Sequence, residues 1–223
     1  MKKTELVALL ENIKACGEVN FLSYGALCQA IEDLNAEIRA ENNRLSGSSN
    51  IAAAAASILK GGKASGNRAL SGSWTVDGKQ YVCDGHRIME ILQPIELEPL
   101  PDDVKPFDVK KIFPDLGSNP EVFQLPTYGE LKSMLQKARA AWRLENGRRK
   151  VRFLFQIENG PALNAEYLLD ALRATGADTL RTVKSNKGTF ICPCYLESDA
   201  ARVLLLPVNV QAGKAAGIHS IAA

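Results

Sequence analysis

The sequence lacks the features that would place it in a membrane or in an oxidising compartment. Its longest apolar run, residues 51–56, is far shorter than the roughly 20 residues needed to cross a bilayer. The start Met-Lys-Lys is followed by Glu5 and Glu11, which interrupt the apolar core of a signal peptide. The five cysteines are odd in number and have no regular spacing, which favours a reducing compartment. We therefore predict a cytoplasmic protein with no membrane partner.

The chain also has little net charge and no catalytic motif. A formal net charge of +2 does not by itself indicate a nucleic-acid binder. The Gly-Gly-Lys segment at 61–63 lacks the leading glycine and the following Ser or Thr of a phosphate loop. Cys83, Asp84 and His86 are neighbours on one expected strand, whereas the members of a catalytic triad converge from separate elements. We predict that the protein is not an enzyme, with no catalytic residues and no cofactor.

Four soft side chains offer a rival interpretation, in which the protein binds zinc. Two residues separate Cys83 from His86, and one residue separates Cys192 from Cys194, a spacing that puts both thiols on one face of a strand. Pro193 distorts that strand, and neither pair has the Cys-x-x-Cys spacing of a zinc knuckle. Because cysteines in sheets are more often buried and inert, we favour the absence of a metal site.

Length and proline distribution predict two domains. At 223 residues, with 46% hydrophobic and 23% charged residues, the chain has an ordinary globular composition and can bury a sizeable core. Seven prolines between 94 and 126 exclude long helices there and suit an extended connector. We predict a helix-rich N-terminal domain at 1–93, the connector at 94–126, a second domain at 127–210 and a flexible tail at 211–223.

Periodicity predicts the main elements of both parts. Apolar residues at helical spacing indicate helices over 4–15, 23–42, 51–60, 127–144 and 163–175, the last capped by Asn164 and stopped at Gly176. Asp77-Gly78 between two short runs predicts a hairpin with a type I′ turn. Alternating apolar residues predict a strand over 151–157, two strands follow around a turn at 185–188, and a last buried strand begins at 201.

Three motifs in this order resemble a known family. They are the helix motif Asn-x-x-Tyr-Leu-Leu-Asp-Ala-Leu at 164–172, the ending Leu-Pro-Val at 206–208, and Asp-Gly-His-Arg-Ile at 84–88. Together they resemble the repeating domain of bacterial DNA sliding clamps, the beta subunit of DNA polymerase III. The resemblance is mainly over 127–210, with an echo at 81–91. It implies an α+β fold of one or more DNA-clamp-like domains, with antiparallel sheets and paired amphipathic helices, and makes 1–93 a candidate degenerate clamp domain.

The resemblance also implies a function. It predicts a non-catalytic, sliding-clamp-like processivity factor for DNA replication that binds duplex DNA nonspecifically, with a DNA polymerase or other replication protein as partner and homo-oligomers as the assembly. A phage or mobile element is one source of such a small clamp. In this interpretation Arg87 lies near the inner surface. The alternative is a clamp-fold adaptor that binds a protein and has lost DNA binding.

A run of cations supplies the candidate DNA-binding residues. Between 132 and 152 the chain has a single acid, Glu145, against many basic residues. Spacings of seven and eleven place three of these cations on one helix face, where they can neutralise phosphates without reading bases. The alternative without a DNA-binding role is that these cations form a solvated helix face followed by a basic turn. With Arg87, the predicted DNA-binding set is Lys132, Lys137, Arg139, Arg143, Arg148, Arg149 and Lys150.

Overall fold

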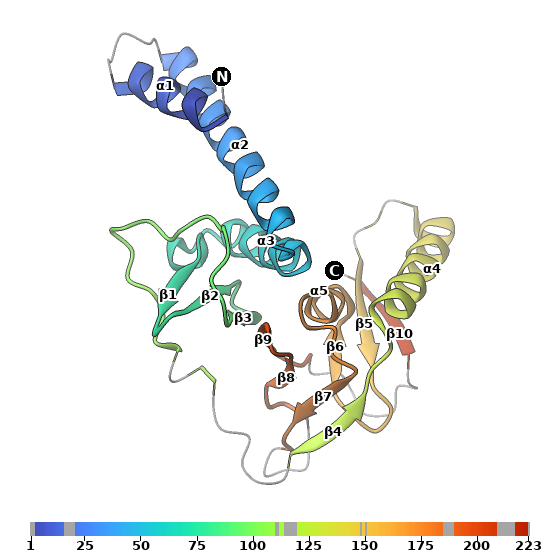
Figure 1. Cartoon of the computed structure of the whole chain (residues 1–223). Coiled ribbons are helices and arrows are strands. Elements are labelled where there is room, and N and C mark those ends of the chain that lie inside the picture. Colours follow the sequence, from blue (N-terminus) through green and yellow to red (C-terminus); the bar gives the residue numbers. More distant parts are fainter. Residues whose placement is uncertain are drawn as a thin grey trace.

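The computed structural model describes residues 3–15, 21–109, 112–113, 120–147, 149, 151–184, 190–208 and 217–222 (Figure 1). In this part of the chain the helices are α1 (Lys3–Ala15), α2 (Phe21–Leu45), α3 (Ser49–Ala64), the short 3₁₀ helix η1 (Arg68–Leu70), α4 (Tyr128–Asn146) and α5 (Ala165–Thr175). The strands are β1 (Trp74–Val76), β2 (Lys79–Cys83), β3 (Arg87–Ile91), β4 (Glu121–Gln124), β5 (Val151–Gln156), β6 (Ala162–Asn164), β7 (Thr179–Thr182), β8 (Cys194–Glu197), β9 (Ala201–Leu205) and β10 (Gly217–Ala222).

The main sheet is antiparallel and is built from two similar units. Its seven strands follow the order β1-β2-β3-β9-β8-β7-β4. In the first unit α3 precedes β1, β2 and β3, and in the second α5 precedes β7, β8 and β9. The last strand of each unit lies at the centre, where β3 pairs with β9 and Met89 is opposite Val203. Helices α3 and α5 pack against each other, so the predicted α+β class with antiparallel sheets and paired helices is confirmed.

The helices and the sheet enclose the larger core. Alternate strand residues such as Val82, Met89 and Val203 are buried on the side that faces α3 and α5. Ile58 from α3 and Leu168 from α5 complete this layer, and both side chains are fully buried. Burying such side chains is the main favourable term in folding, at about 1.5–3 kcal/mol each. The small residues of α3 allow it to lie close to the sheet.

Strands from both sides of the proline-rich segment belong to the main sheet. β3 precedes that segment and β9 follows it, yet the two strands pair along their length. Part of the segment covers the sheet face away from the helices, where Leu100 and Val109 pack on Trp74, Tyr81 and Tyr195. The division into domains at 94–126 stays a prediction. In the structure the segment both connects the two units and covers their shared sheet.

A second sheet of three strands holds the end of the chain. Its order is β10-β5-β6, and β10 pairs with β5 from Gly217 opposite Gln156 to Ala222 opposite Val151. The sequence predicted a flexible tail over 211–223, whereas in the structure residues 217–222 form the strand β10. The small residues there carry no local strand signal, because the pairing is made with a strand far away in the sequence. Residues 209–216 lie outside the described part of the chain.

Helices α1 and α2 form an antiparallel hairpin that projects from the body (Figure 1). Lys3 Nζ lies 3.0 Å from Glu37 Oε2, and at the other end Lys14 Nζ is 6.0 Å from the ring centre of Tyr24. No residue of α1 is buried, and in the described part of the chain its main contacts are with α2. Among the described helices, none has the length and apolar character that a membrane span requires.

Candidate nucleic-acid interface

Helix α4 is capped at both ends by local hydrogen bonds. Thr127 forms a capping box: its backbone N–H donates to Glu130 Oε2 at 2.8 Å, and Glu130 N–H donates to Thr127 Oγ1 at 3.3 Å. The hydrogen bonds from the Thr127 backbone and hydroxyl lower the pKa of Glu130. At the other end Gly147 has a φ of 64° and donates its N–H to Arg143 O. The helix is thereby fixed at both ends, which fixes the positions of its cations.

The cations of α4 lie on two sides of the helix. Leu131 and Leu135 are buried and define the core side. Lys132, Arg139 and Arg143 share one flank, as their spacing predicted, since seven and eleven residues are close to two and three turns. Lys137 is about 140° around the helix from Lys132, so it belongs to another face. The cationic row on this flank of α4, here called the α4 row, therefore consists of Lys132, Arg139 and Arg143.

A hollow between α4, α5 and β5 brings three arginines together. Its volume is about 660 Å³, and Arg139, Arg143 and Arg149 line it with Trp142. The indole Nε1 of Trp142 donates to the backbone O of Arg149 at 3.1 Å, which holds the turn after α4 against the helix. This contact brings Arg149 to the same place as the α4 row. Arg148 and Lys150, also predicted from the sequence, lie outside the described residues.

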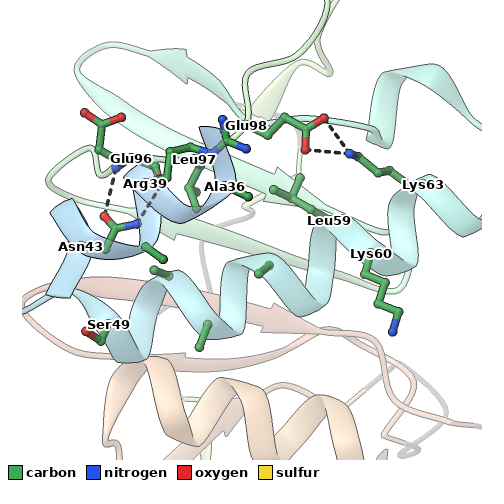
Figure 2. Close-up of a pocket in the computed structure, with 14 residues that line it drawn as sticks. Ala36, Arg39, Asn43, Ser49, Leu59, Lys60, Lys63, Glu96, Leu97 and Glu98 are labelled. Carbon is green, nitrogen blue, oxygen red and sulfur yellow. Dashed lines mark hydrogen bonds and ion pairs between the residues drawn. The ribbon is translucent and has the colours of Figure 1, made fainter. Parts of the chain in front are cut away.

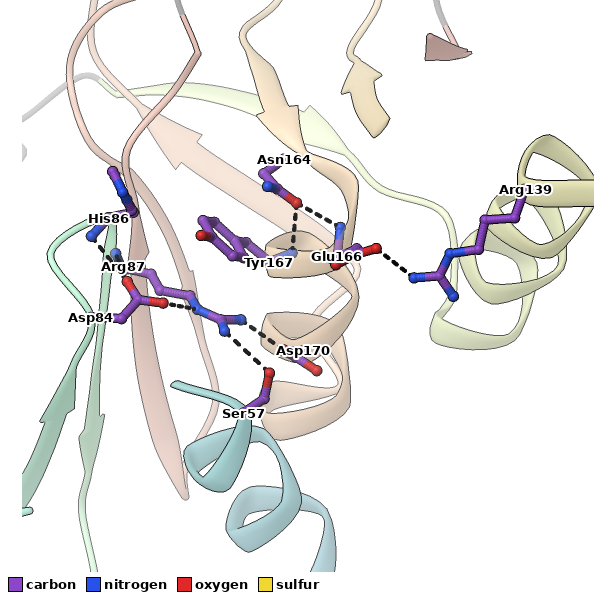
Figure 3. A network of polar contacts seen from close by, with 9 residues as sticks. All are labelled: Ser57, Asp84, His86, Arg87, Arg139, Asn164, Glu166, Tyr167 and Asp170. Carbon is purple, nitrogen blue, oxygen red and sulfur yellow. Dashed lines mark hydrogen bonds and ion pairs between the residues drawn. The ribbon is translucent and has the colours of Figure 1, made fainter. Parts of the chain in front are cut away.

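An acidic residue from α5 enters the same hollow. Arg139 Nη2 lies 2.5 Å from Glu166 Oε1, and Figure 3 shows this arginine reaching across from α4 to the start of α5. The Arg139 side chain is 43% exposed, and exposed ion pairs contribute only about 0–1 kcal/mol. A phosphate that approaches Arg139 therefore competes with a weak internal partner.

The structure contradicts the predicted place of Arg87 on a cationic surface. Its side chain is only 3% exposed, and its guanidinium bonds two carboxylates: Nε lies 2.8 Å from Asp84 Oδ2 and Nη1 lies 2.7 Å from Asp170 Oδ2. The guanidinium carbon is 4.2 Å from the ring centre of Tyr167, a cation–π contact. A charge that is buried and neutralised in this way is not available to a phosphate. Arg87 therefore does not belong to an exposed cationic surface.

The Arg87 cluster ties three elements together (Figure 3). Asp84 Oδ1 accepts the backbone N–H of His86 and of Arg87 at 2.9 and 3.0 Å, across a turn where Gly85 has a φ of 89°. Arg87 Nη2 donates to Ser57 Oγ on α3 at 3.2 Å, while Asp170 comes from α5. The sequence named Asp84, Arg87 and Asp170 only as members of two separate motifs. It did not indicate that they meet each other and Ser57, because no local pattern joins residues on three elements.

Among the residues that the structure describes, the four cysteines do not gather with other ligands into a metal site. Cys83, His86, Cys192 and Cys194 are all described, and in the described part of the chain no three His, Cys, Asp or Glu side chains gather as ligands. Burial raises the pKa of the Cys194 thiol to about 12, and Cys194 Sγ lies 3.8 Å from Cys192 O. A buried thiol of this kind is a poor nucleophile and a poor metal ligand.

The three motifs that resemble the clamp family meet at one place. Tyr167 of the helix motif lies against Arg87 and His86, with its ring centre 6.2 Å from that of His86. Leu206 of the Leu-Pro-Val ending donates its backbone N–H to His86 O at 3.0 Å. Segments far apart in the sequence thus form one cluster on the same side of the sheet.

Several bacterial DNA sliding clamps are among the solved structures that are similar to this chain. The Helicobacter pylori beta clamp bound to a DNA ligase peptide is 13% identical, with a TM-score of 0.42 over 65% of this chain and 58% of the clamp chain. The same clamp in complex with 3,4-difluorobenzamide has 13% identity and a TM-score of 0.45 over 72% and 64% of the two chains. The Bacillus subtilis DNA polymerase sliding clamp has 14% identity and a TM-score of 0.42 over 64% and 57%.

The clamp family named from the sequence is thus also the family of the matching structures. This chain spans less than two thirds of the length of those sliding clamps. No protein-family model matches the sequence, and no curated protein matches it. The roles of individual residues therefore rest on this chain's own contacts and charges.

Proposed function

We propose that this protein is a non-catalytic, clamp-like accessory of DNA replication in the cytoplasm that binds duplex DNA without sequence preference. The observation that supports this function is the gathering of Arg139, Arg143 and Arg149 at one hollow, with Lys132 on the same helix flank. Guanidinium groups bond phosphate oxygens in a two-pronged geometry, and nonspecific binding needs phosphate contacts without base contacts. A replication polymerase is the partner that such a function implies.

A salt titration with a charge-reversed variant tests DNA binding. If Lys132, Arg139, Arg143 and Arg149 each contact a phosphate, log affinity for a random-sequence duplex falls with log salt at a slope of about −3.6. Arg139→Glu/Arg143→Glu removes two of these contacts, so we expect weaker binding and a slope of about −1.8. Fluorescence anisotropy of a labelled duplex at several salt concentrations measures both quantities.

The matched control is Arg44→Glu/Arg68→Glu, which changes the net charge by the same amount on α2 and η1. We expect this control to keep the wild-type slope. If both double variants lose affinity equally, the effect is one of overall charge and the α4 row has no special role. If the wild-type protein binds DNA without salt dependence, or not at all, the phosphate interface does not exist.

A second candidate function is a protein-interaction adaptor without DNA binding. It is favoured by Leu206, whose side chain is 43% exposed directly after β9 and beside the exposed His86. An exposed leucine next to an aromatic pair can receive an apolar side chain of a short peptide. The salt titration separates the two functions, because absent or salt-independent DNA binding favours the adaptor.

We also propose that copies of the chain associate through sheet edges. Within the described residues β1 and β4 are the edge strands of the main sheet, and Val122 on β4 is 55% exposed. Exposed edges offer unpaired N–H and C=O groups to another chain. We expect light scattering to report an oligomer, and Val122→Lys to shift it toward the monomer. A wild-type monomer at high protein concentration would contradict association through the sheet edges.

A further inference from the structure

An apolar groove lies where α2 and α3 diverge, away from the cationic hollow (Figure 2). Its volume is about 530 Å³. Ala36 and Ala40 from α2 face it on one side, and Ala52, Ala53 and Ala56 of α3, together with Leu59, face it on the other. Leu97 closes the back. None of the residues that line the groove belongs to the three motifs, at 84–88, 164–172 and 206–208, that resemble sliding clamps.

The back wall of the groove is held rigidly in place. Asn43 Nδ2 donates to Glu96 O at 2.8 Å, and Glu96 N–H donates to Asn43 Oδ1 at 3.1 Å, as the dashed lines of Figure 2 show. Lys63 Nζ lies 2.6 and 2.7 Å from the two carboxylate oxygens of Glu98. Ser73 donates both its N–H and its hydroxyl to Glu98 O. The groove is therefore preformed and needs no ordering when a ligand enters.

Cations without partners flank the groove. Lys63 is neutralised by Glu98, but in the described part of the chain Arg39 on α2 and Lys60 on α3 form no ion pair. Glu96 also lines the groove, and in Figure 2 its carboxylate lies at the end away from Lys60 and Lys63. Two positive charges that form no ion pair among the described residues, one on each helix, thus border an apolar floor, and the charged residues of the lining (Arg39, Lys60 and Lys63 against Glu96 and Glu98) sum to +1. They complement a ligand that is apolar on one side and negatively charged at its margins.

We propose that this groove binds an amphipathic helix of a partner protein, with bulky apolar side chains on one face and carboxylates beside them. The spacing of four between Ala36 and Ala40, and again between Ala52 and Ala56, leaves two rows of small residues on neighbouring helices. Large side chains of a third helix fit between such rows, since helices pack ridges into grooves at 8–10 Å. The flanking carboxylates meet Arg39 and Lys60. A helix bound in this way contacts the alanines of both rows.

A peptide selection on the full chain tests this proposal. The probe is a displayed library of peptides of about 16 residues, long enough to form a helix. Selection uses the wild-type protein, with counter-selection on Ala56→Glu, which puts a charge into the groove at an exposed position. We expect enriched peptides to have apolar residues at positions i, i+3 or i+4 and i+7, and an excess of Asp and Glu.

Three variants then locate the binding site with one enriched peptide. Ala56→Glu and Arg39→Glu should each raise its Kd by about tenfold or more, because one intrudes on the apolar floor and the other reverses a flanking charge. Arg44→Glu, on the same helix but outside the groove, should leave the Kd unchanged within about twofold. A peptide with lysines in place of its carboxylates should bind Arg39→Glu more tightly than it binds the wild type.

Several results would overturn the proposal. No enrichment over the Ala56→Glu variant would mean that no helix binds here. Enriched peptides without an acidic excess, or with equal affinity for Arg39→Glu, would contradict the role of the flanking charges. Binding of decanoate by the wild type and not by Ala56→Glu, with no peptide enriched, would assign the groove to a small anionic amphiphile. None of these results depends on DNA binding, because the groove and the α4 row share no residue.

Discussion

Arg87→Ala is expected to lower the free energy of unfolding by about 3–5 kcal/mol, the loss seen when one partner of a buried ion pair is removed. The Asp84 side chain is 2% exposed, and it would keep a buried negative charge without its guanidinium partner. Asp170 and the ring of Tyr167 would lose the same group. Urea denaturation followed by circular dichroism measures the change.

Two further variants separate the loss of charge pairing from the loss of packing. Arg87→Met/Asp84→Asn/Asp170→Asn removes the unpaired charges together with the arginine, and we expect it to be more stable than Arg87→Ala by several kcal/mol. Arg68→Ala removes an exposed arginine that pairs only with the exposed Asp103, and should cost about 1 kcal/mol or less. If Arg87→Ala lowers the free energy of unfolding as little as Arg68→Ala does, the Arg87 cluster does not hold α3, β3 and α5 together.

Gly62→Ala is expected to destabilise the protein by about 2–3 kcal/mol, although alanine is the better helix former by about 1 kcal/mol. Gly62 lies in α3, where an added Cβ would meet the backbone O of Leu70 at 2.1 Å and that of Cys83 at 2.9 Å. Neither oxygen can move without shifting η1 or β2. The glycine thus allows α3 to approach the backbone of both neighbours, and the clash outweighs the gain in helix propensity.

Gly25→Ala in α2 is the matched control for this prediction. An added Cβ at Gly25 meets no atom within 4 Å, so only the helix propensity changes. We expect this variant to raise the free energy of unfolding by about 0.5–1 kcal/mol. The two substitutions are chemically identical and should have opposite signs in the same urea titration. Equal effects would show that the contact of Gly62 with Leu70 is not a tight one.

Local signals in the sequence predicted most helices and turns. The Asp77-Gly78 turn has positive φ at both residues, 51° and 78°, as a type I′ hairpin requires. Asn164 caps α5 by accepting from Glu166 N–H and Tyr167 N–H, and Gly176 ends it with a φ of 62°. Such features depend on a few neighbouring residues, so the sequence shows them directly. The predicted α4, at 127–144, likewise differs from the structure only at its ends.

Features made by distant segments could not be predicted in the same way. Nothing local joins β3 to β9 or β10 to β5, because strand pairing depends on which edges the rest of the fold leaves open. Arg87 illustrates the same limit for the site. Its charge and its place in the Asp-Gly-His-Arg motif fit a surface role, and only the approach of Asp170 from α5 buries and neutralises it. The α4 row was predictable because a single helix sets its spacing.

The central pairing of β3 with β9 has a consequence for synthesis on the ribosome. After β3 emerges, roughly 110 further residues must be made before β9 appears, which takes about 5–20 seconds at ordinary translation rates. During that interval the nascent chain exposes an unpaired edge whose residues, such as Met89 and Ile91, are buried in the finished protein. We therefore expect holdase chaperones to bind the nascent chain mainly in this interval, when the apolar residues of β3 are exposed.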